Sequence, residues 1–145
     1  MQTIWITGGS SGIGFAVAKK FLLENWIVVI SSSNNEKLSK AEKKLKDITK
    51  KNNIYSLRCD ITNYKEVEET ISYIEDKISP INIALLNAAA YSPNKNQDFD
   101  INNYNLLINV NLNGTINCID VLKDYMKVRN NLISIVSSPV GYRGM

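Results

Sequence analysis

Three glycines, Gly8, Gly12 and Gly14, lie between an apolar run at residues 3–6 and a helical apolar pattern that begins at Phe15. This order predicts a strand, a tight turn and the first turn of a helix. The unpaired N–H groups at the start of a helix favour negative charge, and glycines leave room for a ligand beside the backbone. The turn is therefore a candidate site for a pyrophosphate, although glycines also form turns that bind nothing.

Small or polar residues also follow each of the other predicted strands, at Ser31–Ser33, Asp60, Asn87 and Ser137–Ser138. Each has a plain structural interpretation, because Ser, Asp and Asn are common turn residues. Their repetition at five strand ends is a pattern that a random surface seldom produces. Ligands of parallel sheets bind outside the carboxyl ends of the strands, so these residues are candidates for one shared site.

The elements that must position these residues follow from apolar patterning. Buried strands are predicted at residues 3–6, 26–30, 54–59, 83–86 and 132–136. Helices are predicted from the Gly turn to Asn25, along the stripe Leu38, Ala41, Leu45 and Ile48, from a capping box at Asn63 and Glu66 to Pro80, and over Tyr104 to Met126. Strict alternation predicts a Rossmann-type α/β fold, a doubly wound parallel sheet in three α/β/α layers, over a single domain of residues 1–145.

Composition excludes several classes of protein. Of the 145 residues 44% are hydrophobic, and the net charge of +3 with Lys concentrated at residues 37–51 favours a solvated helix face over a nucleic-acid site. Histidine is absent, and Cys59 and Cys118 are far apart, so we expect buried, reduced thiols and no zinc site. No apolar stretch has the length of a membrane span, and no signal peptide is evident, which predicts a cytoplasmic protein without a membrane partner.

The string at residues 7–14 resembles the T-G-x-x-x-G-I-G signature of the short-chain dehydrogenase/reductase family. The resemblance implies that this turn binds NAD(H) or NADP(H) through Thr7, Gly8, Ser10, Ser11, Gly12, Ile13 and Gly14. Cys59-Asp60-Ile61-Thr62 is similar to the family's C-D-V-T segment, in which the Asp accepts a hydrogen bond from the adenine amino group. That similarity implies cofactor contacts for Asp60 and Ile61.

Asn87-Ala88-Ala89-Ala90 resembles the family's N-N-A-G segment, with Leu86 in place of the first Asn and Ala89 in place of Gly. The resemblance implies that Asn87 steadies the sheet, while Ala88 and Ala89 leave room for the adenosine ribose. The extra methyl group of Ala89 narrows that approach.

Two catalytic residues are implied in the same way. Asn111, in a V-N-L-x-G segment, matches the Asn of the family's catalytic tetrad, although an Asn inside a helix faces solvent by default. Ser138 matches the Ser that binds the substrate's oxygen. The Y-x-x-x-K pair that the family carries further downstream does not follow Ser138, and Tyr142 cannot supply it, since no Lys stands four residues later. The resemblance therefore covers the first part of the family's length, with the fold truncated after the fifth strand.

Cofactor preference is predicted from the end of the second strand. Ser32 stands where the family's NAD-selective members carry Asp, and Ser33 where NADP-selective members often carry Arg. Hydroxyl groups do not repel a 2′-phosphate, and Lys37 adds positive charge, so NADP(H) is expected to be preferred over NAD(H). The alternative is a plain turn that does not discriminate.

The function that the resemblance implies is an oxidoreductase that moves a hydride between nicotinamide and an alcohol or carbonyl substrate, a homo-oligomer in its intact form. The alternative is a dinucleotide-binding module, or an inactive fragment, that lacks the Tyr/Lys pair. A Rossmann-like methyltransferase would share the glycines but is not expected to carry Asp60, Asn111 and Ser138 together.

Overall fold

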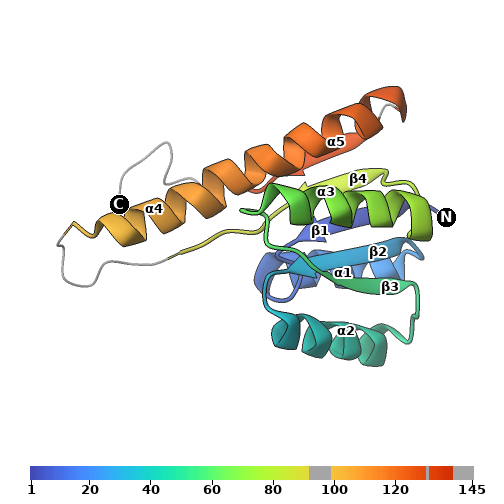
Figure 1. Ribbon diagram of the computed structural model, residues 1–145. Helices are drawn as coiled ribbons and strands as arrows, with labels where there is room; N and C mark the ends of the chain where they lie inside the picture. The colour runs from blue at the N-terminus through green and yellow to red at the C-terminus, as the bar shows by residue number, and fades with distance from the viewer. Residues whose placement is uncertain (92–98, 130, 139–145) are drawn as a thin grey trace.

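The computed structural model describes residues 1–91, 99–129 and 131–138. Strands and helices alternate along these residues, as predicted (Figure 1). The elements are β1 (Thr3–Thr7), α1 (Gly12–Leu23), β2 (Ile27–Ser32), α2 (Asn35–Thr49), β3 (Ile54–Arg58), α3 (Tyr64–Tyr73) with the π-helix η1 (Ile74–Ile78), β4 (Ile83–Leu86), α4 (Ile101–Ile108), the π-helix η2 (Asn109–Gly114), α5 (Thr115–Arg129) and β5 (Leu132–Ile135).

The five strands form one parallel sheet in the order β3-β2-β1-β4-β5. The central strand β1 is buried along its whole length, because it has a neighbouring strand on each side and helices above and below. β3 and β5 are the edge strands, and Leu132 and Ile135 of β5 remain more than half exposed. The predicted doubly wound α/β architecture is confirmed over the described residues.

Helices cover both faces of the sheet (Figure 1). Side chains alternate along β1, so Ile4 and Ile6 pack with α1 and α2, while Trp5 packs with α3 and α5 on the opposite face. Each face thus buries its own apolar cluster, which gives the three predicted layers.

The helix starts explain how the chain turns at each strand end. Asn63 caps α3 as predicted, since its side chain accepts the N–H groups of Lys65 and Glu66. The capping box is only half formed, because Glu66 reaches back to the N–H of Asp60 instead of that of Asn63. α1 is followed, as predicted, by Asn25 in the left-handed region, with φ of 63°.

Two helix predictions were wrong in detail. The long helix begins at Ile101, three residues before the predicted start, because Asp100 caps it by accepting the N–H of Asn102. It runs to Arg129 and contains η2, where the helix widens by one residue per turn. On α2, Ile48 is 46% exposed and Thr49 is buried instead.

The long helix extends past the sheet, so α4 buries none of its side chains (Figure 1). In residues 1–91, 99–129 and 131–138 no helix has the length and apolar character needed to cross a bilayer. The cytoplasmic location expected from the sequence stays a prediction. Cys59 and Cys118 are buried and unpaired, as predicted, and burial raises the pKa of the Cys118 thiol to about 12.

Candidate functional site

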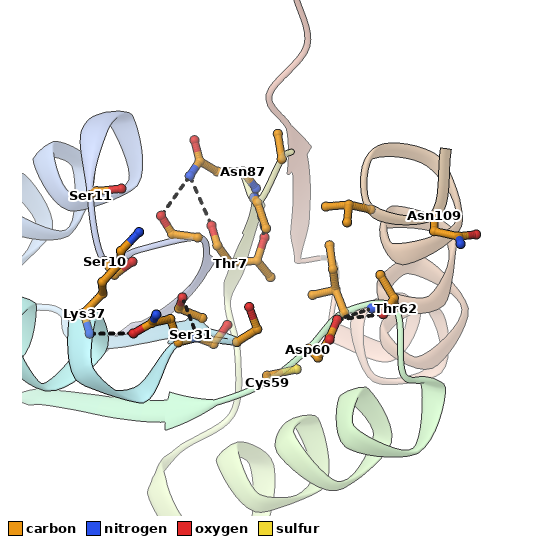
Figure 2. A pocket seen from close by; sticks show the side chains of 18 of the residues that line it. Thr7, Ser10, Ser11, Ser31, Lys37, Cys59, Asp60, Thr62, Asn87 and Asn109 are labelled. Atoms are coloured by element: carbon orange, nitrogen blue, oxygen red, sulfur yellow. Dashed lines mark hydrogen bonds between the residues drawn. The ribbon is translucent and has the colours of Figure 1, made fainter. Parts of the chain in front are cut away.

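A cavity of about 570 Å³ opens at the carboxyl edge of the sheet. The ends of β1, β2, β3 and β4 line it from one side, and residues of α4 and η2 line it from the other (Figure 2). Its walls consist of Thr7, Gly8, Ser10, Ser11, Ser31, Ser32, Ser33, Asn34, Lys37, Cys59, Asp60, Ile61, Thr62, Asn87, Ala88, Ala89, Leu106, Asn109 and Val110. Most of the residues predicted from strand ends therefore meet at one place.

The three glycines of the turn that precedes α1 lie in different surroundings. A Cβ on Gly8 would lie 2.8 Å from Ala88 Cα, and one on Gly14 would lie 2.6 Å from Gly8 O, so both are required by packing inside the protein. Gly12 has φ of +53°, and a Cβ there would meet nothing within 4 Å. Gly12, Ile13 and Gly14 do not line the cavity itself. Open space beside the helix start therefore occurs at Gly12.

The N-terminus of α1 differs from those of α2, α3 and α4. Asn34, Asn63 and Asp100 each accept a backbone N–H at the start of their helix, whereas the Ser11 side chain makes no capping hydrogen bond. The first N–H groups of α1 thus lack a side-chain acceptor among the described residues, and Ser10 and Ser11 line the cavity beside them. This end of α1 has the donors and the dipole that an anion requires.

Thr7 and Asn87 join the ends of β1 and β4. Thr7 Oγ1 accepts the N–H groups of Asn87 and Ala88 at 2.9 and 3.0 Å. Asn87 Nδ2 donates to Thr7 O at 3.1 Å and to Gly8 O at 3.2 Å. These four hydrogen bonds hold the turn after β1 against the segment that follows β4.

Asp60 combines a turn role with an open acceptor. Its Oδ1 accepts the N–H of Thr62 at 3.0 Å and the hydroxyl of Thr62 at 2.8 Å, which closes the turn after β3. Its Oδ2 makes no hydrogen bond to the residues that the structure describes, and Asp60 lines the cavity. The Asp60 N–H and the Arg58 guanidinium both bind Glu66 Oε2, and they lower the pKa of the Glu66 carboxyl.

The segment between β2 and α2 supplies hydroxyl and amino groups. Ser32 Oγ accepts the N–H of Asn34 at 3.3 Å, and Asn34 in turn caps α2 at Lys37 N, at 2.9 Å. Ser33 and Lys37 are exposed, and both line the cavity. Lys37 is labelled in Figure 2. No carboxylate stands at the end of β2, between Ser31 and Asn34.

Asn111 lies within η2 and holds the segment that follows β4. Its Oδ1 accepts the N–H of Ala90 at 2.7 Å, and its Nδ2 donates to Ala90 O at 3.0 Å. The side chain therefore does not merely face solvent, although it does not line the cavity. Ser138 follows β5, is exposed and likewise does not line the cavity.

The general acid and base expected of the family have no counterpart after Ser138. Tyr73 and Lys77 have Y-x-x-x-K spacing, but they lie on α3 and η1, and Tyr73 lines a separate cavity of about 270 Å³ with Arg58 and Glu66. Tyr91 has the same spacing to Lys95, but Lys95 lies outside the described residues, as does Tyr142.

Sequence reasoning missed part of the cavity wall. Leu106, Asn109 and Val110 line it because the long helix passes over the strand ends, a placement that helical spacing alone does not give. Cys59 and Thr62 flank Asp60 and Ile61, so their place in the segment after β3 was the available signal. Ser31 and Ser32 were predicted in the turn after the second strand, but both lie within β2. Ser31 is 1% exposed and accepts the indole N–H of Trp5.

A parallel sheet in the order 3-2-1-4-5, with a glycine turn after its first strand and an open cavity at its carboxyl edge, defines a Rossmann-like α/β domain. The sequence model of the short chain dehydrogenase family matches residues 2–145. The chain belongs to this family.

The chain is also similar to individual members of the short-chain dehydrogenase family. The chain is 30% identical over 142 residues to 3-dehydrosphinganine reductase TSC10B of Arabidopsis thaliana. This alignment covers 95% of this chain and 41% of that protein. A short chain dehydrogenase from Bacillus anthracis superposes with a TM-score of 0.89 at 28% identity, over 99% of this chain and 58% of that one. An alcohol dehydrogenase from the archaeon Thermococcus sibiricus, complexed with 5-hydroxy-NADP, superposes with a TM-score of 0.89 at 21% identity. The match covers 100% of this chain and 61% of that chain. The chain spans less than half the length of the curated relatives that match nearly all of it.

Proposed function

We propose that this chain forms the adenosine- and pyrophosphate-binding part of an NAD(P)-dependent short-chain dehydrogenase/reductase, which in its intact form moves a hydride between nicotinamide and an alcohol or carbonyl carbon. The observation that carries the proposal is the cavity at the carboxyl edge, because residues from four strand ends line it together. Its volume of about 570 Å³ lies in the range of small-molecule sites.

The pyrophosphate is assigned to Ser10–Gly14. The uncapped N-terminus of α1 supports this assignment, as does the open space at Gly12. Family membership supports Ile13 within this segment, and Thr7 and Gly8 as further contacts.

The adenine is assigned to Asp60 and Ile61, and the adenosine ribose to the space beside Asn87, Ala88 and Ala89. Asp60 Oδ2 supports the first assignment, because an unused carboxylate oxygen can accept the adenine amino group. Thr62 supports it too, since its hydrogen bonds to Oδ1 fix the carboxylate plane.

The preferred cofactor is NADP(H), with NAD(H) bound more weakly. Ser32 and Ser33 line the cavity without the carboxylate that would repel a 2′-phosphate, and Lys37 lines it as well. Glu36, the nearest carboxylate in sequence, is exposed and paired with Lys40, and it is not part of the wall.

Ser138 is assigned to orient the substrate's oxygen, and Asn111 to the role of the Asn in the family's catalytic tetrad, which family membership supports. The nicotinamide would supply or accept the hydride. Neither side chain is an acid or base near pH 7, so this chain alone should have negligible turnover. A dinucleotide-binding module without turnover is the second candidate, since Tyr73 and Lys77, the one pair with Y-x-x-x-K spacing inside the described residues, do not line the cavity.

The intact protein is proposed to form homo-oligomers. Apolar side chains on the long helix support this proposal, because Tyr104, Leu112 and Ile116 are each about half exposed.

The assignment of the pyrophosphate is tested by titrating the purified chain with NADPH and following cofactor fluorescence. Gly12→Asn adds a side chain that tolerates a left-handed backbone, and we expect about 100-fold weaker binding, about 2.7 kcal/mol. Lys50→Asn is the matched control, since Lys50 also has positive φ, at 56°, but lies at the far end of α2. Gly14→Val is a poorer test because its side chain would break the packing of the turn.

Wild-type affinity in Gly12→Asn would contradict the pyrophosphate site, and a wild-type chain that binds neither NADPH nor NADH would contradict the function. Turnover is assayed separately, with NADPH and a panel of carbonyl compounds. Turnover by the wild-type chain that Ser138→Ala abolishes would favour the enzyme over the binding module and refute the need for the missing Tyr and Lys.

A further inference from the structure

Trp5 and Ser31 form a buried hydrogen bond beneath the cavity. Trp5 lies in the middle of β1 and is 0% exposed, and its indole Nε1 donates to Ser31 Oγ at 3.1 Å. Ser31 lies near the end of β2, is 1% exposed and lines the cavity. The pair therefore connects the apolar core with the wall of the candidate site.

The direction of this hydrogen bond is fixed by chemistry. An indole N–H can only donate, so the Ser31 oxygen must be the acceptor. A hydroxyl group carries one proton as well as its lone pairs, and that proton remains available after Trp5 has been bound. Among the residues that the structure describes, the bond to Trp5 is the one hydrogen bond that the Ser31 hydroxyl makes. A buried donor without an acceptor is unfavourable, so the site is more stable with an acceptor beside Ser31.

The position of Ser31 identifies which part of a ligand would supply that acceptor. The Ser31 carbonyl accepts the N–H of Gly9 in the glycine turn, at 3.2 Å, and the carbonyl of the next residue accepts the N–H of Cys59, at 3.1 Å. Ser31 therefore lies between the turn assigned to the pyrophosphate and Asp60, which is assigned to the adenine amino group. The part of a dinucleotide between these two groups is the adenosine, whose ribose oxygens and purine ring nitrogens are acceptors.

We propose that Ser31 donates a hydrogen bond to an acceptor atom of the bound adenosine, and that Trp5 is a positioning residue that commits the Ser31 hydroxyl to this donation. The inference rests on the proposed dinucleotide function. Under this proposal Ser31 is a hydrogen-bond donor in the cavity wall, and the buried Trp5 fixes its orientation. Ser31 is separate from the segment 32–37, where the 2′-phosphate is expected.

The test is a double-mutant cycle on the whole chain, with 5′-AMP and NADP⁺ as probes in isothermal titration calorimetry. Ser31→Ala should weaken 5′-AMP about tenfold, because it removes one buried donor. Trp5→Phe should weaken it by less, and the double variant should bind no more weakly than Ser31→Ala alone, since Trp5 acts through Ser31. Ser31→Thr retains the hydroxyl and should restore most of the affinity. Ser39→Ala is the control, because Ser39 is exposed on α2 and does not line the cavity.

Trp5→Phe also leaves a gap in the core, so its thermal midpoint should fall whether or not the proposal holds. The coupling in affinity is the result that a purely structural Trp5 would not produce. Additive losses in the double variant would overturn the positioning role. If Ser31→Ala binds 5′-AMP as tightly as the wild type, the donor role is overturned. This comparison does not involve Trp5, so it tests the donor role even if Trp5→Phe does not fold. A wild-type chain that binds neither probe would overturn the proposed function and this inference with it.

Discussion

The two ends of the parallel sheet differ in how fully their polar side chains are paired within the protein. At the amino end, Asn82 Oδ1 accepts the N–H of Thr3 at 2.8 Å, and Asn131 Nδ2 donates to Ile81 O at 2.7 Å. At the carboxyl end, Asp60 keeps an oxygen and Ser31 a hydroxyl proton without a partner in the described chain, and a cavity lies over them.

The difference lies in what the side chains reach. Amides at the amino end bind backbone groups of segments far away in sequence, so they join neighbouring strands and satisfy buried N–H and C=O groups. The exception is Thr3 Oγ1, the one buried side-chain polar atom that lacks a hydrogen bond among the described residues. At the carboxyl end the glycine turn and the uncapped α1 leave donors for a ligand. Stability and binding should therefore be separable by position.

The largest effect on stability is expected at the amino end, from Glu75→Ala. The Glu75 side chain is 4% exposed, its Oε1 accepts the N–H of Ile81 at 2.9 Å and its Oε2 accepts Arg129 Nη1 at 2.7 Å. Its removal leaves a buried N–H unpaired, which should cost about 2 kcal/mol in urea unfolding. Glu69→Ala, on an exposed face of α3, should cost little. NADPH affinity should stay unchanged, and a parallel loss of affinity would break the separation.

A smaller effect is expected at the carboxyl end, from Ser32→Asp. The added carboxylate repels a 2′-phosphate and can accept ribose hydroxyls, so the affinity ratio should move about tenfold, about 1.4 kcal/mol, from NADP(H) toward NAD(H). Stability should barely change. Ser39→Asp adds the same charge outside the cavity and controls for net charge. Tighter binding of NAD(H) by the wild type would reverse the preference, and a constant ratio would show that the 2′ position is read elsewhere.

The smallest effect concerns the pH dependence of stability at Glu66. The Asp60 N–H and the Arg58 guanidinium lower the pKa of Glu66 in the folded chain. The stabilisation that ionised Glu66 gives the folded chain is therefore fully present above the ordinary carboxyl pKa. It is lost as the pH falls through the lowered pKa. The difference in urea midpoint between wild type and Glu66→Gln should shrink from about pH 7 to about pH 3. Glu69→Gln should show no such trend, and a pH-independent difference for Glu66→Gln would contradict the assignment.

Most of the fold was predictable because each strand is a short apolar run between turn residues, and because alternation with helices leaves few topologies. The π-helix η2 was not predictable. Gly114 allows the long helix to approach Ile61, since a Cβ there would lie 2.6 Å from Ile61 Cγ1, and Asn117 Nδ2 donates to Ile61 O. Helical spacing carries no sign of this tertiary contact.

The candidate site was predictable where it depends on strand ends and unpredictable where it depends on packing across the sheet. Asp60 and Asn87 follow their strands directly, so the topology brings them to one edge. The wall formed by Asn109 and Val110 depends on where the long helix lies. The bond from Trp5 to Ser31 depends on the register of β1 against β2, which pairs Trp5 with Val29 and Thr7 with Ser31.

The central claim, that the dinucleotide binds at the carboxyl end of the sheet, is tested most directly by titrating ¹⁵N-labelled chain with NADP⁺ and following backbone amide chemical shifts. The predicted result is a saturable change at Gly8–Gly12, Ser31–Ser33, Asp60–Thr62 and Asn87–Ala89, with Glu75, Asn82 and Asn131 at the amino end unchanged. Saturable shifts confined to the amino end, or no shifts at millimolar NADP⁺, would contradict it.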